Sequence, residues 1–226
     1  MAVIPMWNDP LNRLKGKIPH GDPGGESCPG RVEPVKFTRR DLPYRQITDI
    51  REYWFDDIRP EDRVLDIGAN VGAFSLRAAR SSLHVVAVEP VATEILEENL
   101  RLNHAEVRVI RGALGTGKPA EIDWDDTRVR VPTYTLGQLI TMAGGCDFLK
   151  CDCEGAEWLI RPEDLAGIRR IEMELHLPPI GGPPDRVLLG YIGRHYDFSI
   201  ERKPCHVVLG VMGILHATRH GDEESS

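Results

Sequence analysis

The sequence predicts an α/β fold: a doubly wound, mostly parallel seven-stranded sheet with helices on both faces. Two observations support this prediction. Short apolar runs, which fit strands buried on both faces, alternate along the chain with longer stretches of helical periodicity. Strands that alternate with helices in this way form parallel sheets. A glycine-rich turn, Gly68–Gly72, joins an apolar run to the helix that follows, and such turns let the backbone approach a ligand closely.

The first half of the sheet is predicted from three apolar runs. The run Val64–Ile67 is too short for a helix and is followed by a helix over 73–80, whose apolar residues fall mostly on one side. The run 84–88 (His-Val-Val-Ala-Val) is the second strand, the amphipathic stretch 92–103 is the next helix, and 106–110 is the third strand.

The second half begins with a β-hairpin over 120–131, because two short alternating pieces flank Asp125-Asp126. A short helix is predicted over 135–142, and 146–150 leads into the fourth strand. The remaining elements are a helix around Trp158, a strand over 170–175, a helix capped by Asp185 that runs through Tyr196, and two last strands over 198–201 and 207–215.

Three segments are expected along the 226 residues. An irregular N-terminal extension, rich in proline and glycine, covers 1–36, one folded domain covers 37–220, and an acidic tail covers 221–226. Within the domain, a helix is predicted over 46–58, because apolar residues recur there at spacings of three and four, and Pro60 ends it.

The composition is that of a soluble globular protein, with 41% hydrophobic and 28% charged residues. No apolar run approaches the ~20 residues that span a bilayer, and no signal pattern opens the chain, so we expect cytoplasmic localisation and no membrane partner. Five cysteines, an odd number, predict reduced thiols. The net charge of −7 argues against general affinity for nucleic acid. The sequence leaves both a monomer and a homo-oligomer open.

The glycine turn differs from a dinucleotide site, which has the pattern G-x-G-x-x-G. Asn70 stands where the middle glycine would be, and Asp66 precedes the first glycine by two residues. A carboxylate there would repel a pyrophosphate and attract the ammonium and sulfonium of S-adenosylmethionine. Glu89, 21 residues after Gly68 (89 − 68), is placed to accept hydrogen bonds from ribose hydroxyls. The small residues Gly112 and Ala113, at the end of the third predicted strand, leave room for an adenine ring.

The residues with polar or small side chains at predicted strand ends should meet in space, because ligands of open α/β sheets bind over the carboxyl ends of the strands. These residues are Asp66, Glu89, Ala113, Asp152, Glu154, Glu174 and His176. They are spread over 111 residues (176 − 66 + 1), and we expect them to line one cleft.

Several segments resemble the FkbM family of S-adenosylmethionine-dependent methyltransferases. They are Val64–Ala79, Glu89-Pro90, Glu98-Asn99-Leu100 with Asn103, Leu149–Glu157 and Glu172–His176. The most specific element is Lys-x-Asp-x-Glu-Gly-Ala-Glu, which begins at Lys150. The chain departs from the family at Leu136-Gly137, where Leu-Asp is usual, and at Cys151 and Cys153, where small aliphatic residues are usual.

The resemblance implies a class I methyltransferase fold with its last strand antiparallel, S-adenosylmethionine as cofactor, and a small-molecule acceptor such as a sugar, polyketide or other metabolite that is methylated on a hydroxyl. It implies that the cofactor is contacted by Asp66, Gly68, Asn70, Gly72 and Glu89, and the predicted cofactor site also includes Ala69, Pro90, Ala113 and Asp152. It places Lys150, Asp152, Glu154 and His176 around the acceptor.

An alcohol acceptor must lose its proton during methyl transfer, so a side-chain base is expected. His176 is the first candidate, because the reference pKa of histidine lies near neutrality. Asp152 is the second, either as the base or as a group that orients the acceptor. Lys150 and Glu154 are alternatively an ion pair with each other.

Other interpretations stay open at this stage. Mg²⁺ or Mn²⁺ could be bound by Asp152, Glu154, Glu157 and His176, although the preferred interpretation has no metal. The acceptor could be a macromolecule, either a peptide side chain or an RNA nucleotide held by Arg39, Arg40, Arg128 and Arg130. A non-catalytic binding protein or a nicotinamide oxidoreductase is the last alternative, and Asp66 and the missing middle glycine argue against the oxidoreductase.

Overall fold

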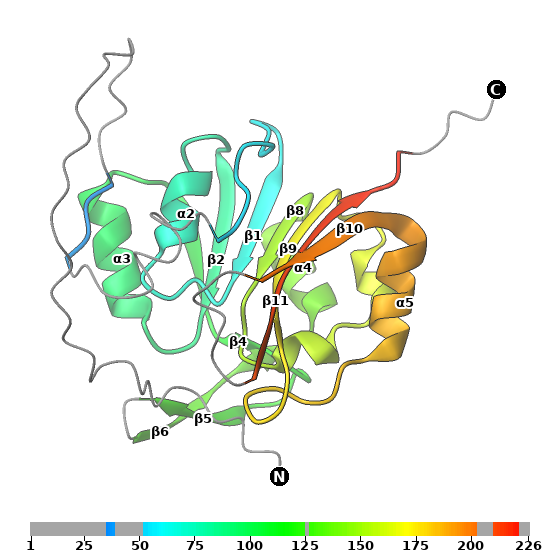
Figure 1. Cartoon of the computed structure of the whole chain (residues 1–226). Coiled ribbons are helices and arrows are strands. Elements are labelled where there is room, and N and C mark those ends of the chain that lie inside the picture. The colour runs from blue at the N-terminus through cyan, green and yellow to red at the C-terminus, as the bar shows by residue number, and fades with distance from the viewer. Residues whose placement is uncertain (1–34, 39–51, 125–126, 203–209, 222–226) are drawn as a thin grey trace, which may run out of the picture.

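The computed structural model describes residues 35–38, 52–124, 127–202 and 210–221. Within these ranges a seven-stranded sheet has the strand order β10-β11-β9-β8-β1-β2-β3 (Figure 1). Its strands are β1 (Arg63–Ile67), β2 (His84–Glu89), β3 (Val107–Arg111), β8 (Phe148–Cys151), β9 (Arg170–His176), β10 (Tyr196–Glu201) and β11 (Val211–Arg219).

The strand directions confirm the predicted mostly parallel sheet. Strands β3, β2, β1, β8 and β9 are parallel to their neighbours in that order. The last strand, β11, lies between β9 and β10 and is antiparallel to both. The strand order reverses between β1 and β8, because β2 and β3 follow on one side of β1 and β8 starts on the other. Ligands of open α/β sheets bind at such a reversal.

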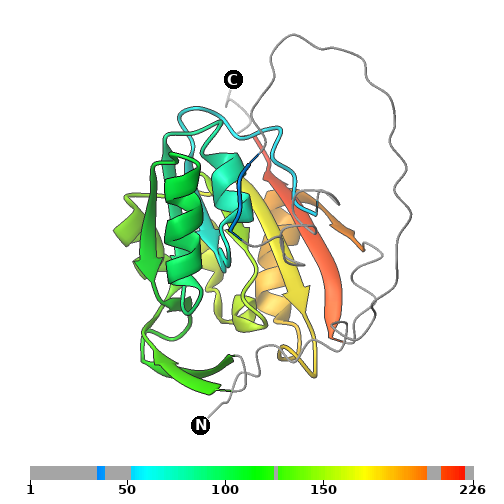
Figure 2. The ribbon, with the colours of Figure 1, turned by 90° about the vertical axis from the view of Figure 1, so that its left-hand side faces the viewer.

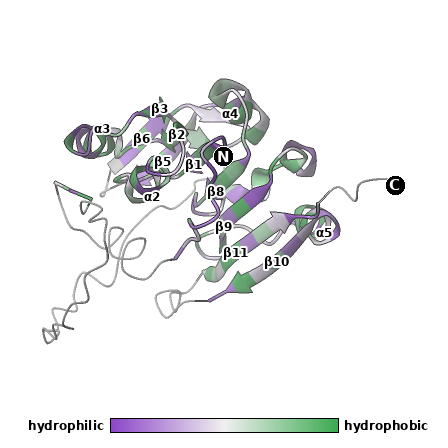
Figure 3. Ribbon diagram, turned by 90° about the horizontal axis from the view of Figure 1, so that it is seen from above, coloured by the Kyte–Doolittle hydropathy of each residue, from purple (hydrophilic) through white to green (hydrophobic). Residues whose placement is uncertain are grey.

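Helices cover both faces, as the doubly wound prediction requires, and Figure 3 shows α2 and α4 on opposite sides of the sheet. One face carries α2 (Ala73–Ala78) and α3 (Thr93–Leu102), and the other carries α4 (Leu136–Ala143), α5 (Arg186–His195) and the 3₁₀ helices η2 (Ala156–Leu159) and η3 (Pro162–Leu165). Side chains alternate along a strand, so Leu65 and Ile67 pack under α4 while Val64 packs under α2. Both cores are therefore buried by the same short strands.

Two small sheets lie beside the main one. β4 (Ala113–Leu114) pairs in parallel with β7 (Thr133–Tyr134). β5 (Ala120–Trp124) and β6 (Thr127–Val131) form the predicted antiparallel hairpin, which projects below the main sheet in Figures 1 and 2. None of the helices in the described ranges combines the length and apolar character needed to cross a membrane.

The segment 52–58 differs from the prediction of a helix over 46–58, since it contains turns and no helix. The backbone N–H of Trp54 donates to the buried Glu172 carboxylate at 3.1 Å, where a helix would have used a backbone carbonyl. The Trp54 indole stacks on His216, with ring centroids 4.1 Å apart. Contacts with the sheet thus replace a helical repeat here. Residues 46–51 and 1–34 lie outside the described residues.

Other boundaries shift by a few residues. The helix predicted around Trp158 is the short 3₁₀ helix η2. The last strand starts at Val211 and continues to Arg219, beyond the predicted end at 215, because Ala217 and Thr218 still pair with β9. The rest of that predicted strand, 207–209, and the tail 222–226 lie outside the described residues, and the proposed domain boundaries stay a prediction.

Candidate active site

The glycine turn after β1 is held tightly against the end of β8. Gly68 and Ala69 donate their backbone N–H groups to the Val88 carbonyl at 2.9 and 3.1 Å. Gly68 has φ +73°, and a Cβ built on it would lie 1.7 Å from the backbone oxygen of Asp152. Only glycine fits there, so this residue fixes how closely the turn and the Asp152 loop approach each other.

Glu89, at the end of β2, connects that strand to the glycine turn. Its carboxylate accepts backbone hydrogen bonds from Asn70 at 2.8 Å and from Val91 and Ala92 at 2.9 Å. Burial raises the pKa of Glu89, and these hydrogen bonds oppose the rise. A carboxylate has about four acceptor positions, so three backbone donors leave about one for a ribose hydroxyl. The residues at this turn therefore fit a ribose-bearing cofactor.

Asp66 and Lys150 form a buried ion pair under the turn. Asp66 is 0% exposed, and its carboxylate accepts a hydrogen bond from Ser75 Oγ at 2.6 Å and lies 3.2 Å from Lys150 Nζ. The same ammonium donates to the Gly68 carbonyl at 2.7 Å. Burial lowers the pKa of Lys150, but the charges of Asp66 and Asp152 outweigh burial and raise this pKa above its usual value. The alternative pairing of Lys150 with Glu154 is therefore wrong.

Asp152 follows β8 and faces the same ammonium at 3.9 Å. Its Oδ2 accepts a hydrogen bond from the Tyr53 hydroxyl at 3.0 Å. Burial raises the pKa of Asp152, but the charges of Lys150 and His176 outweigh it and lower the pKa below its usual value. With a side chain 26% exposed, Asp152 is an ionised carboxylate that can be reached from outside the sheet.

Tyr53 is a site residue that the sequence did not indicate. It is 1% exposed, its ring lies over the Lys150 ammonium at 5.4 Å, and burial followed by the charge of Asp152 raises its pKa well above the usual value. The segment 52–58 carries no motif, so its contact with a loop 99 residues away had no signal in the sequence.

His176, at the end of β9, is 1% exposed and fixed by Glu157. One oxygen of the Glu157 carboxylate accepts the His176 backbone N–H at 2.6 Å and lies 3.2 Å from Nδ1. The other ring nitrogen, Nε2, lies 3.4 Å from Glu154 and 3.6 Å from Glu174. Burial lowers the pKa of His176, but its carboxylate neighbours, Glu157 first, raise it to about 9. In the protein as described, His176 is therefore an imidazolium at neutral pH.

Glu174 adds a further acidic group to this cluster. Burial, and then the charges of Asp152, Glu52 and Glu154, raise its pKa well above the usual value. One ligand-type atom from each of Asp152, Glu174 and His176 lies within 4.8 Å of the other two. The polar ends of β8 and β9 therefore meet in one acidic cluster beside the Asp66–Lys150 pair.

The other predicted positions also lie at this edge of the sheet. Gly112 donates its N–H to the Glu89 carbonyl at 3.1 Å, which places Ala113 next to the end of β2. Gly72 has φ +88° and precedes α2. Cys151 and Cys153 flank Asp152 with their sulfurs 3.3 Å apart as free thiols. The predicted strand ends thus converge, although these contacts do not test which of the residues binds cofactor.

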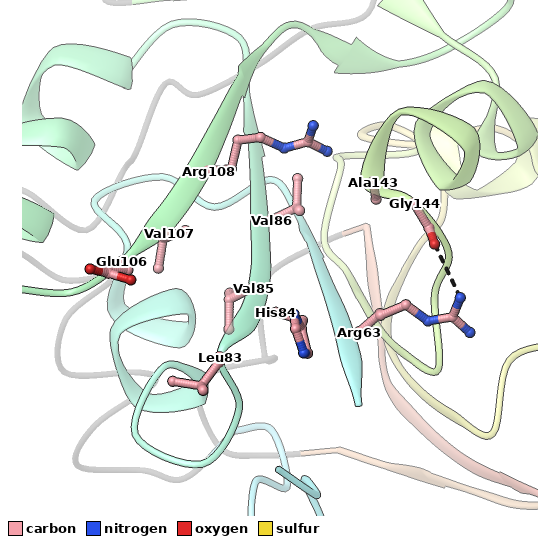
Figure 4. Close-up of a pocket in the computed structure, with 10 residues that line it drawn as sticks. All are labelled: Arg63, Leu83, His84, Val85, Val86, Glu106, Val107, Arg108, Ala143 and Gly144. Atoms are coloured by element: carbon pink, nitrogen blue, oxygen red, sulfur yellow. Dashed lines mark hydrogen bonds between the residues drawn. The ribbon is translucent and has the colours of Figure 1, made fainter. Parts of the chain in front are cut away.

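A separate groove of about 580 Å³ opens at the opposite, amino-terminal edge of the sheet (Figure 4). Arg63, His84 and Arg108 lie around it, and Arg63 donates a hydrogen bond to the Gly144 carbonyl at 3.1 Å. None of the predicted site residues lines this groove. It is therefore distinct from the candidate active site.

The fold is that of a class I methyltransferase: a parallel sheet with an antiparallel last strand beside β9, and a glycine turn at the point where the strand order reverses. A family model described as the methyltransferase FkbM domain matches residues 66–200. The chain belongs to the FkbM family of methyltransferases, whose methyl donor is S-adenosylmethionine. A search of curated protein sequences finds no match.

Solved structures with a similar fold share little sequence with the chain. Magnesium protoporphyrin IX methyltransferase from Synechocystis PCC 6803, solved with bound S-adenosylmethionine, is 17% identical with a TM-score of 0.48, over 78% of this chain and 80% of that one. An rRNA methylase from Streptococcus thermophilus is 12% identical with a TM-score of 0.48, over 72% of this chain and 89% of that one. The family assignment accordingly depends on the sequence match alone.

Proposed function

We propose that the protein transfers the methyl group of S-adenosylmethionine to a hydroxyl of a small molecule in the cytoplasm. The observation that carries this proposal is the Asp152 carboxylate, which is ionised, partly exposed and next to the glycine turn. An alcohol needs a base at the moment of attack, and Asp152 meets that need beside the cofactor turn.

The cofactor side of the proposed site comprises the glycine turn with Asn70, the Glu89 carboxylate and Ala113. S-adenosylmethionine supplies a methyl group on a sulfonium, which is already a good leaving group. Glu89 has about one free acceptor position for a ribose hydroxyl, as derived above. Asp66 acts through Lys150 in this proposal, because its own carboxylate is fully buried against that ammonium.

On the acceptor side, Asp152 accepts the hydroxyl proton while the acceptor oxygen attacks the methyl carbon. Tyr53 and Lys150 hold the Asp152 carboxylate in place, the first by a 3.0 Å hydrogen bond and the second at 3.9 Å. Alignment of donor, methyl group and acceptor supplies several kcal/mol of the barrier reduction. The proposed site contributes this alignment together with the base.

Asp152 is preferred to His176 as the base because of their surroundings. The His176 side chain is only 2% exposed, and both of its ring nitrogens face carboxylates. Because its pKa is raised to about 9, His176 carries a proton on both ring nitrogens at neutral pH and cannot accept the proton of the acceptor hydroxyl. His176 is therefore proposed as a positioning and charge-balancing residue, which revises the order of the two candidate bases.

Two observations among the described residues favour a small-molecule acceptor over a macromolecular one. Arg128 is paired with Asp123 at 3.1 Å and with Glu121 at 3.9 Å, so its charge is already balanced. The acidic cluster around Asp152 would repel a phosphate backbone. Of the other patch residues, Arg130 is exposed on β6, and Arg39 and Arg40 lie outside the described residues.

A release assay tests the proposal with the full chain. Formation of S-adenosylhomocysteine is measured with panels of glycosides, polyketide alcohols and phenols, and the O-methylated form of each compound serves as the blank. Asp152→Asn should lower turnover by ~10²–10⁴-fold. Calorimetric affinity for S-adenosylhomocysteine should stay within a few-fold, and the exposed Glu163→Gln serves as the matched control. Full turnover in Asp152→Asn would refute this base. Amines and thiols are added to the panel, and S-adenosylhomocysteine formed with these compounds only would refute O-methylation.

A further inference from the structure

We propose that Cys151 and Cys153 are a redox modification site: they form a reversible disulfide that displaces Asp152, the residue between them. The two sulfurs lie 3.3 Å apart at the end of β8, and both cysteines are free thiols, so the structure describes the reduced state. Formation of the disulfide does not depend on the proposed function. Its effect on turnover rests on the proposed role of Asp152.

The two thiols lie on the same face of the sheet. Side chains alternate along an extended strand, so residues 151 and 153 share one face and Asp152 points to the other. Cys151 belongs to the apolar core under α4, and Cys153 packs against that core. The sulfurs of a disulfide are about 2.05 Å apart, so the observed 3.3 Å has to shorten by about 1.3 Å. The two residues are therefore already placed for the bond.

The two thiols differ in exposure, and this difference assigns each of them a step. Cys153 is partly exposed, whereas Cys151 is 0% exposed. A small-molecule disulfide from solution, such as glutathione disulfide, therefore meets Cys153 first. Cys151 lies directly behind that sulfur and is placed to attack it in the second step.

The exchange balances in two steps. The Cys153 thiolate attacks glutathione disulfide, which forms a mixed disulfide and releases one glutathione. The Cys151 sulfur then attacks the Cys153 sulfur, loses its proton to solvent and releases the second glutathione. In total two S–H bonds of the protein are replaced by one S–S bond. The protein loses two electrons, and the external disulfide gains them and becomes two thiols.

Bond formation should move Cys153 more than Cys151. The backbone of Cys151 is held in the sheet between Ile67 and Met173, whereas Cys153 lies beyond the end of β8. The Asp152 peptide connects the two cysteines and has to turn when the Cys153 sulfur is drawn toward the strand. The backbone N–H of Asp152, which donates to the Ile67 carbonyl at 3.0 Å, reports such a movement.

The Asp152 carboxylate depends on the position of this peptide. Its Oδ2 accepts the Tyr53 hydroxyl at 3.0 Å and lies 3.9 Å from Lys150 Nζ. A displacement of ~1 Å at a catalytic group lowers turnover by about 100-fold. The disulfide should therefore inhibit the reaction, and reduction of the disulfide should restore it.

The exchange should be slow at neutral pH and faster in alkaline buffer. Burial raises the pKa of Cys153 well above its usual value, and Cys151, Glu157 and Asp152 raise it further. The thiolate is the attacking species, so the rate should increase with pH as the thiolate fraction grows.

Peptide mass spectrometry tests the disulfide in the full chain. The protein is incubated with excess glutathione disulfide in alkaline buffer, remaining thiols are blocked with iodoacetamide, and trypsin is added. Trypsin cleaves after Lys150 and Arg169 but not before Pro162, so the peptide 151–169 contains Cys151 and Cys153 and no other cysteine. We expect this peptide to carry no iodoacetamide and to be lighter than its reduced form by two hydrogen atoms.

Two variants and two further measurements complete the experiment. Cys153→Ala should form no disulfide and keep wild-type turnover before and after the oxidant. The matched control Cys146→Ala removes a buried thiol outside this peptide and should be oxidised like the wild type. Turnover of the oxidised wild type should fall about 100-fold and return with dithiothreitol. Amide hydrogen exchange at Asp152 should become faster in the oxidised protein.

Each outcome decides one part of the proposal. Two alkylated cysteines in peptide 151–169 after prolonged incubation overturn the disulfide, and so does a glutathione adduct that stays on Cys153. Unchanged amide exchange at Asp152 in the oxidised protein overturns the displacement. If the chain methylates no hydroxyl, the peptide mass and the amide exchange still decide, so failure of the proposed function is distinguishable. If circular dichroism shows that Cys153→Ala does not fold, Cys153→Ser replaces it.

Discussion

Replacement of Gly68 by alanine should damage the protein far more than the same change at Gly144. Both glycines have positive φ, +73° and +82°. The left-handed conformation costs alanine about 1–2 kcal/mol at either position. They differ in space: the new Cβ at Gly68 would lie 1.7 Å from the Asp152 carbonyl oxygen, whereas at Gly144 it would meet nothing within 4 Å.

The steric difference can be converted into a magnitude. An ordinary contact is at least 3.4 Å, so the Asp152 backbone must move by more than an ångström. Overpacking of this kind costs about 1–3 kcal/mol, which gives a total of about 2–5 kcal/mol for Gly68→Ala against about 1–2 kcal/mol for Gly144→Ala. A shift of ~1 Å at a catalytic group also lowers turnover by about 100-fold.

Urea unfolding followed by circular dichroism measures the two free energies of unfolding, and the release assay measures turnover. Gly144→Ala should keep wild-type turnover, since Gly144 lies at the end of α4, at the opposite edge of the sheet. Equal destabilisation by the two substitutions would refute the reasoning, because it would mean that the close approach of the turn to Asp152 does not exist in solution.

Three further substitutions test other contacts. Lys150→Met leaves the Asp66 carboxylate buried without its cation, and the free energy of unfolding should fall by about 3–5 kcal/mol; a loss below about 1 kcal/mol would contradict the buried pair. Tyr53→Phe removes the hydrogen bond to Asp152 and should cost about 1.5–3 kcal/mol, with turnover reduced as well; an unchanged melting temperature would show that the bond is not formed. Asp147→Asn breaks a bidentate arginine pair far from the site and should cost about 1 kcal/mol at pH 7 with full activity. Because that pair lowers the Asp147 pKa, its stabilisation is lost as the pH falls through the folded-state pKa, so wild-type and variant stabilities should converge in acid.

The fold could be predicted because its signals are local. The run Val64–Ile67, the glycines after it and the alternation of strands and helices each depend on neighbouring residues. The antiparallel last strand followed from the family resemblance and is confirmed. The helix over 46–58 failed in its described part because the Trp54 backbone bonds to Glu172, 118 residues away, and spacing alone contains no sign of such a partner.

The candidate site could also be predicted only in part. Because the carboxyl ends of parallel strands lie at one edge of a sheet, the positions of Glu89, Asp152 and His176 at predicted strand ends indicated that they would lie together. Partners across the sheet could not be predicted: Lys150 pairs with Asp66 from the adjacent strand, and Tyr53 reaches Asp152 from a loop. The reference pKa of histidine predicted His176 as the first candidate base. The carboxylates around the buried ring raise the pKa of His176, and the sequence gives no sign of these neighbours.

The contacts of residues 52–58 have a practical consequence for anyone who trims the chain. The family match starts at residue 66, yet Tyr53 holds Asp152 and the Trp54 backbone satisfies Glu172, both from upstream of that point. A protein shortened to the matched region would lose β1 residues Arg63–Leu65 and expose two acidic groups that now have partners. Boundaries drawn from sequence similarity are therefore too narrow here, and we expect the fold of the site to require Tyr53 and Trp54.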